Sequence, residues 1–137
     1  MVHIEDHTHP DPKQINAGIM YIVHVNASYK PANIYGGPTR SVSQLCEALA
    51  IASDDRVLHS SVLTTRANGE SELSVPTGVP QLVDGVRVTY FDRITKDHSH
   101  LSLALLNQLQ KEIKNHKQDG LIIHIHAWWN LVSVGAA

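Results

Sequence analysis

The 137-residue sequence predicts an α/β fold with a mainly parallel, Rossmann-like sheet flanked by helices. The apolar runs at residues 19–25 and 121–126 have strand length and are continuous, as in parallel strands that are buried on both faces. Segments with helical periodicity separate the strand-like runs. Strands that alternate with helices in this way form mainly parallel sheets.

The first predicted strand, residues 19–25, leads through a loop into a predicted helix. Pro38 suits the first position of that helix, and Gly37 stands just before it. Asp54 and Asp55 are expected to end the helix. Its sheet-facing stripe has apolar residues at i, i+3, i+4, i+7 and i+10. These are Val42, Leu45, Cys46, Leu49 and Ala52.

The remaining elements follow in order. A second strand is predicted at residues 57–65, followed by a polar segment that starts at Asn68-Gly69. Asp84-Gly85 lies between two apolar runs and is typical of a hairpin turn, with the second strand at residues 86–91. Leu101, Leu105, Leu106, Leu109 and Ile113 mark a second amphipathic helix. Gly120 is expected to end this helix, and the strand 121–126 follows.

Composition is that of an ordinary globular domain, with 42% hydrophobic and 18% charged residues. The formal charge of −2 gives no basic surface for nucleic acid, so no nucleic-acid partner is expected. Cys46 is the single cysteine, which favours a reducing compartment, and we expect a cytoplasmic protein. Peripheral contact with a membrane is left open, but no apolar run approaches the ~20 residues of a membrane span.

The chain is expected to divide into a polar leader and one domain. Residues 1–18 are rich in acids, histidines and prolines and are expected to be disordered, whereas residues 19–137 form the domain. Asn130 could cap a new helix that runs only to Ala137. We therefore expect the domain to be incomplete at its C-terminal end.

The glycine pair Gly36-Gly37 is the first candidate site. It follows a buried strand and precedes a helix, and a backbone without Cβ atoms lets a ligand approach the unpaired N–H groups at the helix start. Phosphate or another anion is the expected ligand. A tight turn with no ligand is the alternative. Arg40 is either a phosphate clamp or a solvated helix residue.

Histidines supply the second group of candidates. His126 closes a predicted strand, where a side chain reaches the ligand crevice of an open α/β sheet. His124 lies two residues deeper on the same face, and we expect it, like His24, to be a hydrogen-bonded core residue.

A metal site is not expected, although the chain has ten histidines. Three pairs have His-x-His spacing, but a zinc site needs three or four ligands, often with cysteine or carboxylate among them. The pairs lie far apart in the sequence. They are His7/His9, His98/His100 and His124/His126.

Four segments together resemble the N-terminal domain of family 4 glycosyltransferases, which are retaining enzymes of the two-domain GT-B fold. The resemblance covers residues 19–137. Its segments are Val25-Asn26-Ala27-Ser28-Tyr29, Tyr35-Gly36-Gly37-Pro38-Thr39, Val62-Leu63-Thr64-Thr65 and His124-Ile125-His126-Ala127-Trp128.

The resemblance implies that the full-length protein transfers a sugar from a nucleotide-diphosphate sugar to a sugar or glycan acceptor. Gly36 and Gly37 would approach the donor phosphates, and His126 would be the catalytic residue near the transferring sugar. Trp128, Trp129 and His124 are the candidates to bind the acceptor sugar, although the tryptophans could instead pack the last helix onto the sheet and His124 could be a core residue. No cofactor is implied beyond the donor substrate.

The sequence departs from the family pattern in three places. The C-terminal domain that holds most of the donor, with its glutamate pair, is not among these residues, so the fragment alone is expected to be inactive. Residues 53–56, Ser-Asp-Asp-Arg, replace the usual glycine-histidine turn, and the leader is longer than usual. The alternatives are a non-catalytic carbohydrate- or nucleotide-binding module and a different nucleotide-dependent α/β enzyme.

Overall fold

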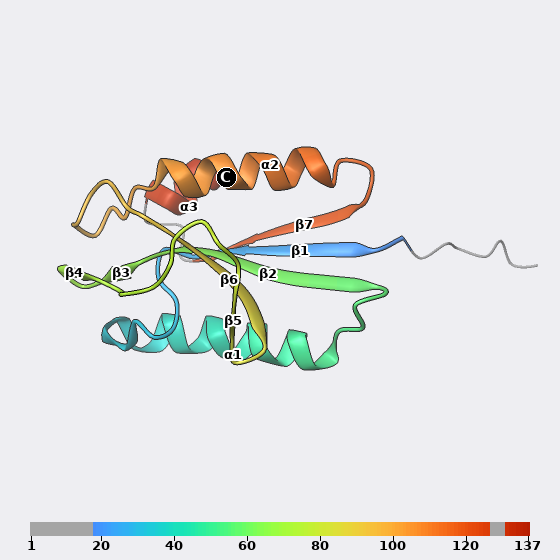
Figure 1. The fold of residues 1–137 in the computed structure, drawn as a ribbon, viewed down its shortest axis with the longest axis horizontal. Coiled ribbons are helices and arrows are strands. Elements are labelled where there is room, and N and C mark those ends of the chain that lie inside the picture. Colours follow the sequence, from blue (N-terminus) through green and yellow to red (C-terminus); the bar gives the residue numbers. More distant parts are fainter. Residues whose placement is uncertain (1–17, 127–130) are drawn as a thin grey trace, which may run out of the picture.

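A computed structural model describes residues 18–126 and 131–137. One five-stranded sheet, in the order β5-β6-β2-β1-β7, lies between α1 on one face and α2 with α3 on the other (Figure 1). The strands of this sheet are β1 (Met20–Val25), β2 (Leu58–Thr65), β5 (Gln81–Val83), β6 (Val86–Phe91) and β7 (Gly120–Ile125). The helices are η1 (Asn33–Tyr35), α1 (Gly37–Ala52), α2 (Leu103–Asn115) and α3 (Leu131–Ala136).

The sheet is mainly parallel, as the continuous apolar runs predict. β1 pairs in parallel with β2 and with β7, and β2 pairs in parallel with β6. Only β5 is antiparallel, joined to β6 by the Asp84-Gly85 turn. The φ angles of 49° at Asp84 and 79° at Gly85 are those of a type I′ turn, so the predicted hairpin is confirmed.

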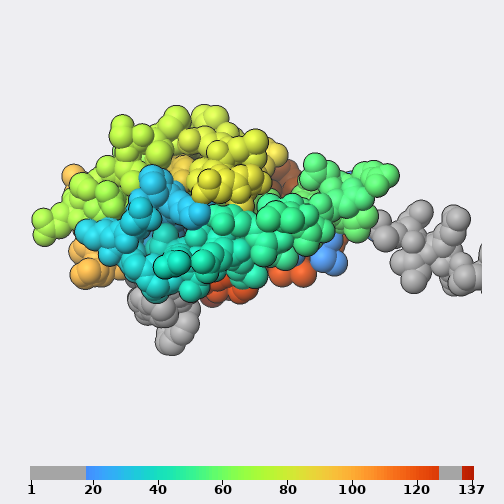
Figure 2. All heavy atoms as spheres, turned by 90° about the horizontal axis from the view of Figure 1, so that it is seen from below, coloured from blue at the N-terminus to red at the C-terminus, as the bar shows by residue number. Residues whose placement is uncertain are grey.

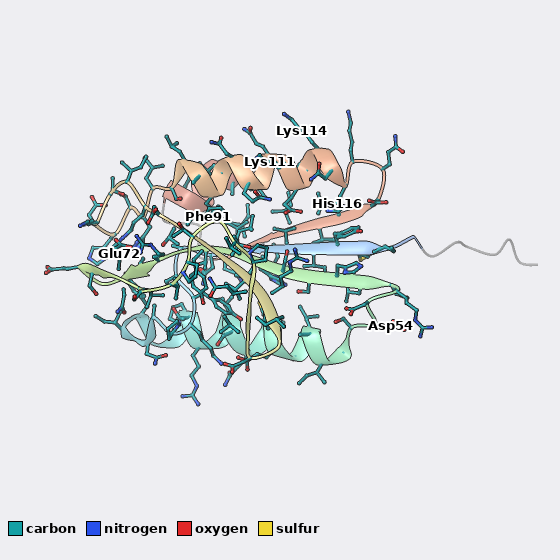
Figure 3. All side chains as sticks on the ribbon, viewed as in Figure 1. Asp54, Glu72, Phe91, Lys111, Lys114 and His116 are labelled. Atoms are coloured by element: carbon teal, nitrogen blue, oxygen red, sulfur yellow. The ribbon has the colours of Figure 1, made fainter. Side chains whose placement is uncertain are left out.

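Alternating residues of the strands fill two apolar layers, one under each helical face (Figure 3). Val62 packs toward α1 with Cys46, and Leu63, the next residue of β2, packs toward α2 with Leu105. Cys46 is fully buried, and burial raises the pKa of its thiol to about 11. This cysteine is therefore a protonated core residue, as its place in the helical stripe predicts.

Helix boundaries differ from the predicted ones because capping decides them. The first helix begins at Gly37, with Gly36 as N-cap, so Pro38 is the second helical residue. The second helix begins at Leu103, since the Ser102 hydroxyl caps it by accepting a hydrogen bond from the Leu105 N–H at 3.3 Å. Gly120 does not end this helix but opens β7.

The polar segment after β2 holds a small hairpin that the sequence pattern does not predict. Strands β3 (Ala67–Asn68) and β4 (Ser71–Glu72) form it, and it lies beside the carboxyl ends of the main strands (Figure 1). Each strand has only two residues, and such pairs have little stability of their own. Contacts with the rest of the domain must therefore hold the hairpin in place.

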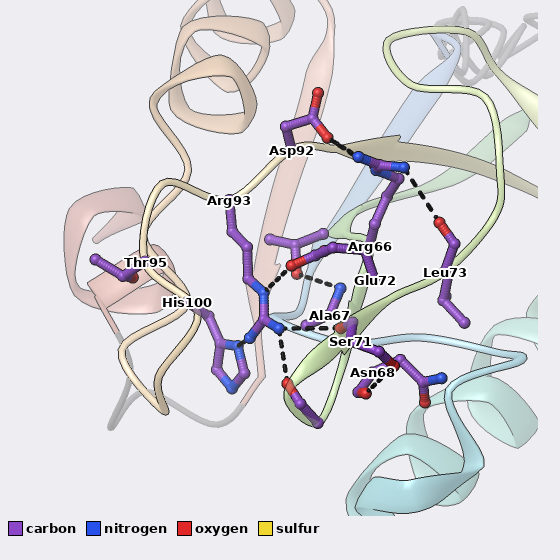
Figure 4. A network of polar contacts seen from close by, with 12 residues as sticks. Arg66, Ala67, Asn68, Ser71, Glu72, Leu73, Asp92, Arg93, Thr95 and His100 are labelled. Carbon is purple, nitrogen blue, oxygen red and sulfur yellow. Dashed lines mark hydrogen bonds and ion pairs between the residues drawn. The ribbon is translucent and has the colours of Figure 1, made fainter.

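Arg93 supplies those contacts from the loop after β6 (Figure 4). Its side chain is fully buried and pairs with Glu72 at 2.6 Å between Nε and Oε1. Nη2 of Arg93 donates to the carbonyl oxygens of Gly69 and Ser71 at 2.7 and 3.1 Å. Nη1 lies 3.1 Å from Nδ1 of His100. One guanidinium thus ties the hairpin to the loop that leads into α2.

We expect Arg93→Met to lower the free energy of unfolding by about 3 kcal/mol, because it removes a buried side chain that pairs with Glu72 and donates to two carbonyl groups. Urea denaturation of wild type and variant measures the change. Arg56→Ala is the control, since the Arg56–Asp54 pair lies at the surface and its loss should leave stability unchanged. Equal midpoints for wild type and Arg93→Met would contradict a structural role for the Arg93 contacts.

Candidate functional site

The candidate site lies at the carboxyl edge of the parallel strands. From β1 the chain adds β2 and then β6 on one side of β1 in the sheet. β7 comes later in the chain but pairs on the other side of β1, so the strand order reverses between β1 and β7. Ligands of open α/β sheets bind at such a reversal, beyond the carboxyl ends of the strands. The glycine pair follows β1, and His126 directly follows β7.

A cavity of about 600 Å³ opens at the glycine pair. Gly36 has a φ of 63° and a ψ of −126°, a conformation that only glycine adopts readily, and no side chain caps the helix start behind it. A Cβ atom at Gly37 would meet no chain atom within 4 Å, so the space beside this residue is open. Arg40 is exposed on the first turn and also lines the cavity.

Polar contacts hold the loop between β1 and α1 in one conformation. The Asn26 side chain donates to the carbonyl oxygen of Ser28 at 2.6 Å, and the hydroxyl groups of Ser28 and Thr39 lie 3.0 Å apart. Lys30 pairs with Glu47 of α1 and with Asp84 of the hairpin turn. The loop is therefore ordered before any ligand arrives.

Three histidines meet at the neighbouring strand ends. His24 of β1 is in register with His124 of β7, and the His126 N–H donates to the Val25 carbonyl oxygen at 2.9 Å, which continues the same ladder. The three side chains share the α1 face of the sheet. Nδ1 of His24 lies 3.0 Å from Nε2 of His126, and the His124 and His126 rings are 4.0 Å apart between centroids.

The environment keeps two of these rings neutral. Burial, followed by the neighbouring His126 and His124, lowers the pKa of His24 to about 4. Burial, followed by His124, lowers the pKa of His126 to about 4. Both imidazoles are therefore uncharged at pH 7, and each can donate one hydrogen bond through its N–H and use its other nitrogen to accept a hydrogen bond or bind a cation.

The prediction that His124 is a core residue is wrong. His124 is exposed, as is Ile122 at 47% on the same face, because β7 is the edge strand and α1 packs on β2 and β6 instead. The view from the α1 side shows atoms of the orange-red C-terminal region emerging along one side of α1 (Figure 2). His24 is fully buried as expected, but its Nε2 has no hydrogen-bond partner among the described residues.

The sequence alone does not connect His24 with the His124/His126 pair. Both strands end in an apolar run that contains a histidine, which is the only local signal. The register that places His24 beside His124 depends on strand pairing across 100 residues and is not visible in the sequence. Trp128, Trp129 and the leader up to residue 17 lie outside the described residues.

A second hollow, of about 500 Å³, lies between the C-terminal half of α2 and the strands beneath it. Tyr21 stacks on His59 and on His116 there, and the label of His116 in Figure 3 marks the end of α2. This hollow faces the amino ends of the strands and does not join the edge that carries the glycine pair.

Comparison with protein-family models, with curated proteins and with solved structures found no match to this chain. Among the residues that the structure describes, every helix is too short or too polar to cross a membrane.

The buried His24 predicts a stability that depends on pH. Its pKa is about 4 in the folded chain and near 6.5 when unfolded, so below pH 6.5 the unfolded chain takes up a proton that the folded chain excludes. The contribution of neutral His24 to the free energy of unfolding should be fully present above pH 6.5 and should be lost as the pH drops toward 4. The expected loss from His24 between pH 7 and pH 5 is on the order of 2 kcal/mol.

Urea denaturation at both pH values, with a chelator present, measures this loss. His24→Gln removes the titrating group and keeps a neutral polar side chain, so the difference between the two pH values should shrink in that variant. An identical difference in wild type and variant would show that His24 does not titrate as expected.

Proposed function

We propose that this domain is the acceptor-side half of a retaining glycosyltransferase of the GT-B type, which moves a sugar from a nucleotide-diphosphate sugar to a sugar or glycan acceptor. One observation carries the proposal. Two of the four segments that resemble the family, those with Gly36-Gly37 and with the strand end at His126, follow adjacent parallel strands and flank the point where the strand order reverses.

The glycine segment supports a role in holding donor phosphates. The first turn of α1 contains no acidic residue and no capping side chain, and Gly36 and Gly37 line a cavity that continues along this helix to Glu47. An anion at the glycine pair would therefore lie at the positive end of the helix dipole. Arg40 adds a positive charge on the same turn. A diphosphate that leaves with the nucleotide accumulates negative charge, which such a helix start stabilises.

The electrostatics of His126 support a role as a neutral hydrogen-bonding group. With a pKa of about 4, its ring is uncharged at pH 7 and can contact a sugar hydroxyl or a phosphate oxygen without binding a proton first. The partner domain would supply the nucleotide site. Catalysis would then rest on positioning and on stabilising the leaving phosphate.

The test is a screen of the full-length protein against a panel of nucleotide sugars and glycan acceptors, with the anomeric configuration of each product determined. Transfer with retention supports the proposal. Binding of sugar or nucleotide without turnover by the full-length protein would instead support a non-catalytic module, and a different nucleotide-dependent reaction would also overturn the proposal.

We expect His126→Ala in the full-length enzyme to lose about 100-fold or more in turnover, because the hydrogen bond to the reacting sugar is lost. Initial rates at saturating donor measure the effect. His59→Ala is the matched control, since His59 lies on β2 and stacks on Tyr21 on the opposite face. Full activity in His126→Ala would remove this residue from the mechanism.

Gly37→Val tests the phosphate role of the glycine pair. A Cβ atom at this position meets no other part of the chain within 4 Å, so the variant should fold, yet it should lose turnover because the added methyl groups block the approach of phosphate. Gly36→Ala provides the contrast, since its φ of 63° predicts a lower Tm. Normal kinetics in a folded Gly37→Val protein would contradict the assignment.

A further inference from the structure

The histidine cluster has a geometry that glycosyl transfer does not require. We propose that His24, His124 and His126 bind one Zn²⁺ ion, with a fourth coordination position open to solvent. Three histidines and a water molecule form a recognised zinc coordination set. This inference does not rest on the proposed function.

The distances suit a shared ion. One candidate ligand nitrogen from each of the three rings can be chosen so that all lie within 4.8 Å of one another, and the closest pair, Nδ1 of His24 and Nε2 of His126, is 3.0 Å apart. Two nitrogen ligands of a tetrahedral zinc ion, each at 2.0–2.1 Å, are about 3.3 Å apart. The exposed His124 ring is free of core packing and can turn to complete the set.

The chemistry of the cluster favours a cation over an anion. Zinc binds neutral imidazole, and the rings of His24 and His126 are neutral at pH 7. Protonated rings would attract an anion more strongly, but burial and the neighbouring histidines oppose protonation of His24 and His126. Nδ1 of His24 and Nε2 of His126, 3.0 Å apart, share at most one proton. A divalent ion can take the place of that proton.

The His24 ring is poorly satisfied within the described part of the chain. Its ring is fully buried, and Nε2 has no hydrogen-bond partner among the described residues, so the cost of burying this polar group is not offset within the chain. A buried polar atom in this condition is often explained by a missing ion or water. An ion shared with His126 would bind Nδ1 of His24, which gives this buried ring a strong interaction, and Nε2 would then carry the proton of the neutral ring.

The three histidines differ in burial, which suits a metal site with one coordination position open to solvent. His24 is buried, His126 is half-buried and His124 is exposed, so the cluster runs from the core to solvent over one face of β1 and β7. The ion would bind where β7 is not covered by α1. Its fourth ligand would be water or an oxygen atom of a bound molecule.

The test uses the full 137-residue chain, stripped of metal with a chelator and titrated with ZnCl₂ in a calorimeter. We expect one ion per chain, and a Tm that rises by roughly 10 °C when free Zn²⁺ reaches a hundredfold excess over Kd. Co²⁺ in place of Zn²⁺ should give the visible absorption of a four-coordinate site with nitrogen ligands.

Variants separate this site from other histidines. His124→Ala leaves the core intact, because the side chain is exposed, and it should weaken binding at least tenfold, as should His126→Ala. His59→Ala and the double variant His7→Ala/His9→Ala are the controls, and both should bind Zn²⁺ like wild type. The inference fails if the chain does not bind one Zn²⁺ ion, or if binding survives in His124→Ala and His126→Ala and is lost in the leader variant.

Discussion

The parallel, in-register pairing of β1 with β2 on one side and β7 on the other is the constraint on which the candidate site depends. β1 lies between strands that are distant in sequence, and its pairing aligns their carboxyl ends at one edge. The glycine loop, the start of α1 and His126 reach that edge for this reason alone. The same register sets His24 beside His124, so one pairing decides both the crevice and the histidine cluster.

α1 covers only part of its face of the sheet, and this uneven burial determines the pKa values and the accessibility of the three histidines. α1 packs on β2 and β6, whereas the α1 face of β7 is left open, and the three histidines lie across this boundary. Burial from the core side lowers the pKa of His24 and His126, and exposure on the other side leaves room for a ligand. A fully covered strand would give a closed core, and a fully exposed one would give ordinary solvated histidines.

Two different binding chemistries therefore share one edge. The helix start at Gly37 offers N–H groups and a positive dipole end to an anion, whereas the neutral imidazoles offer lone pairs to a cation. Around them the loops are tied down by polar contacts, most strongly by Arg93, which joins the β3–β4 hairpin to the loop before α2. Loops held by such contacts lose less conformational entropy when a ligand binds.

Local patterns by themselves determined the alternation of strands and helices, the Asp84-Gly85 hairpin, the burial of Cys46 and the opening of α1 at the glycine pair, because each depends on neighbours within a few residues. Tertiary structure alone decided that β7 is an edge strand, that His124 is exposed, that Glu72 pairs with Arg93 and that His24 joins the late histidine pair. These features arise from contacts between distant segments, whose register follows from the packing of the whole sheet and leaves no mark on the local sequence.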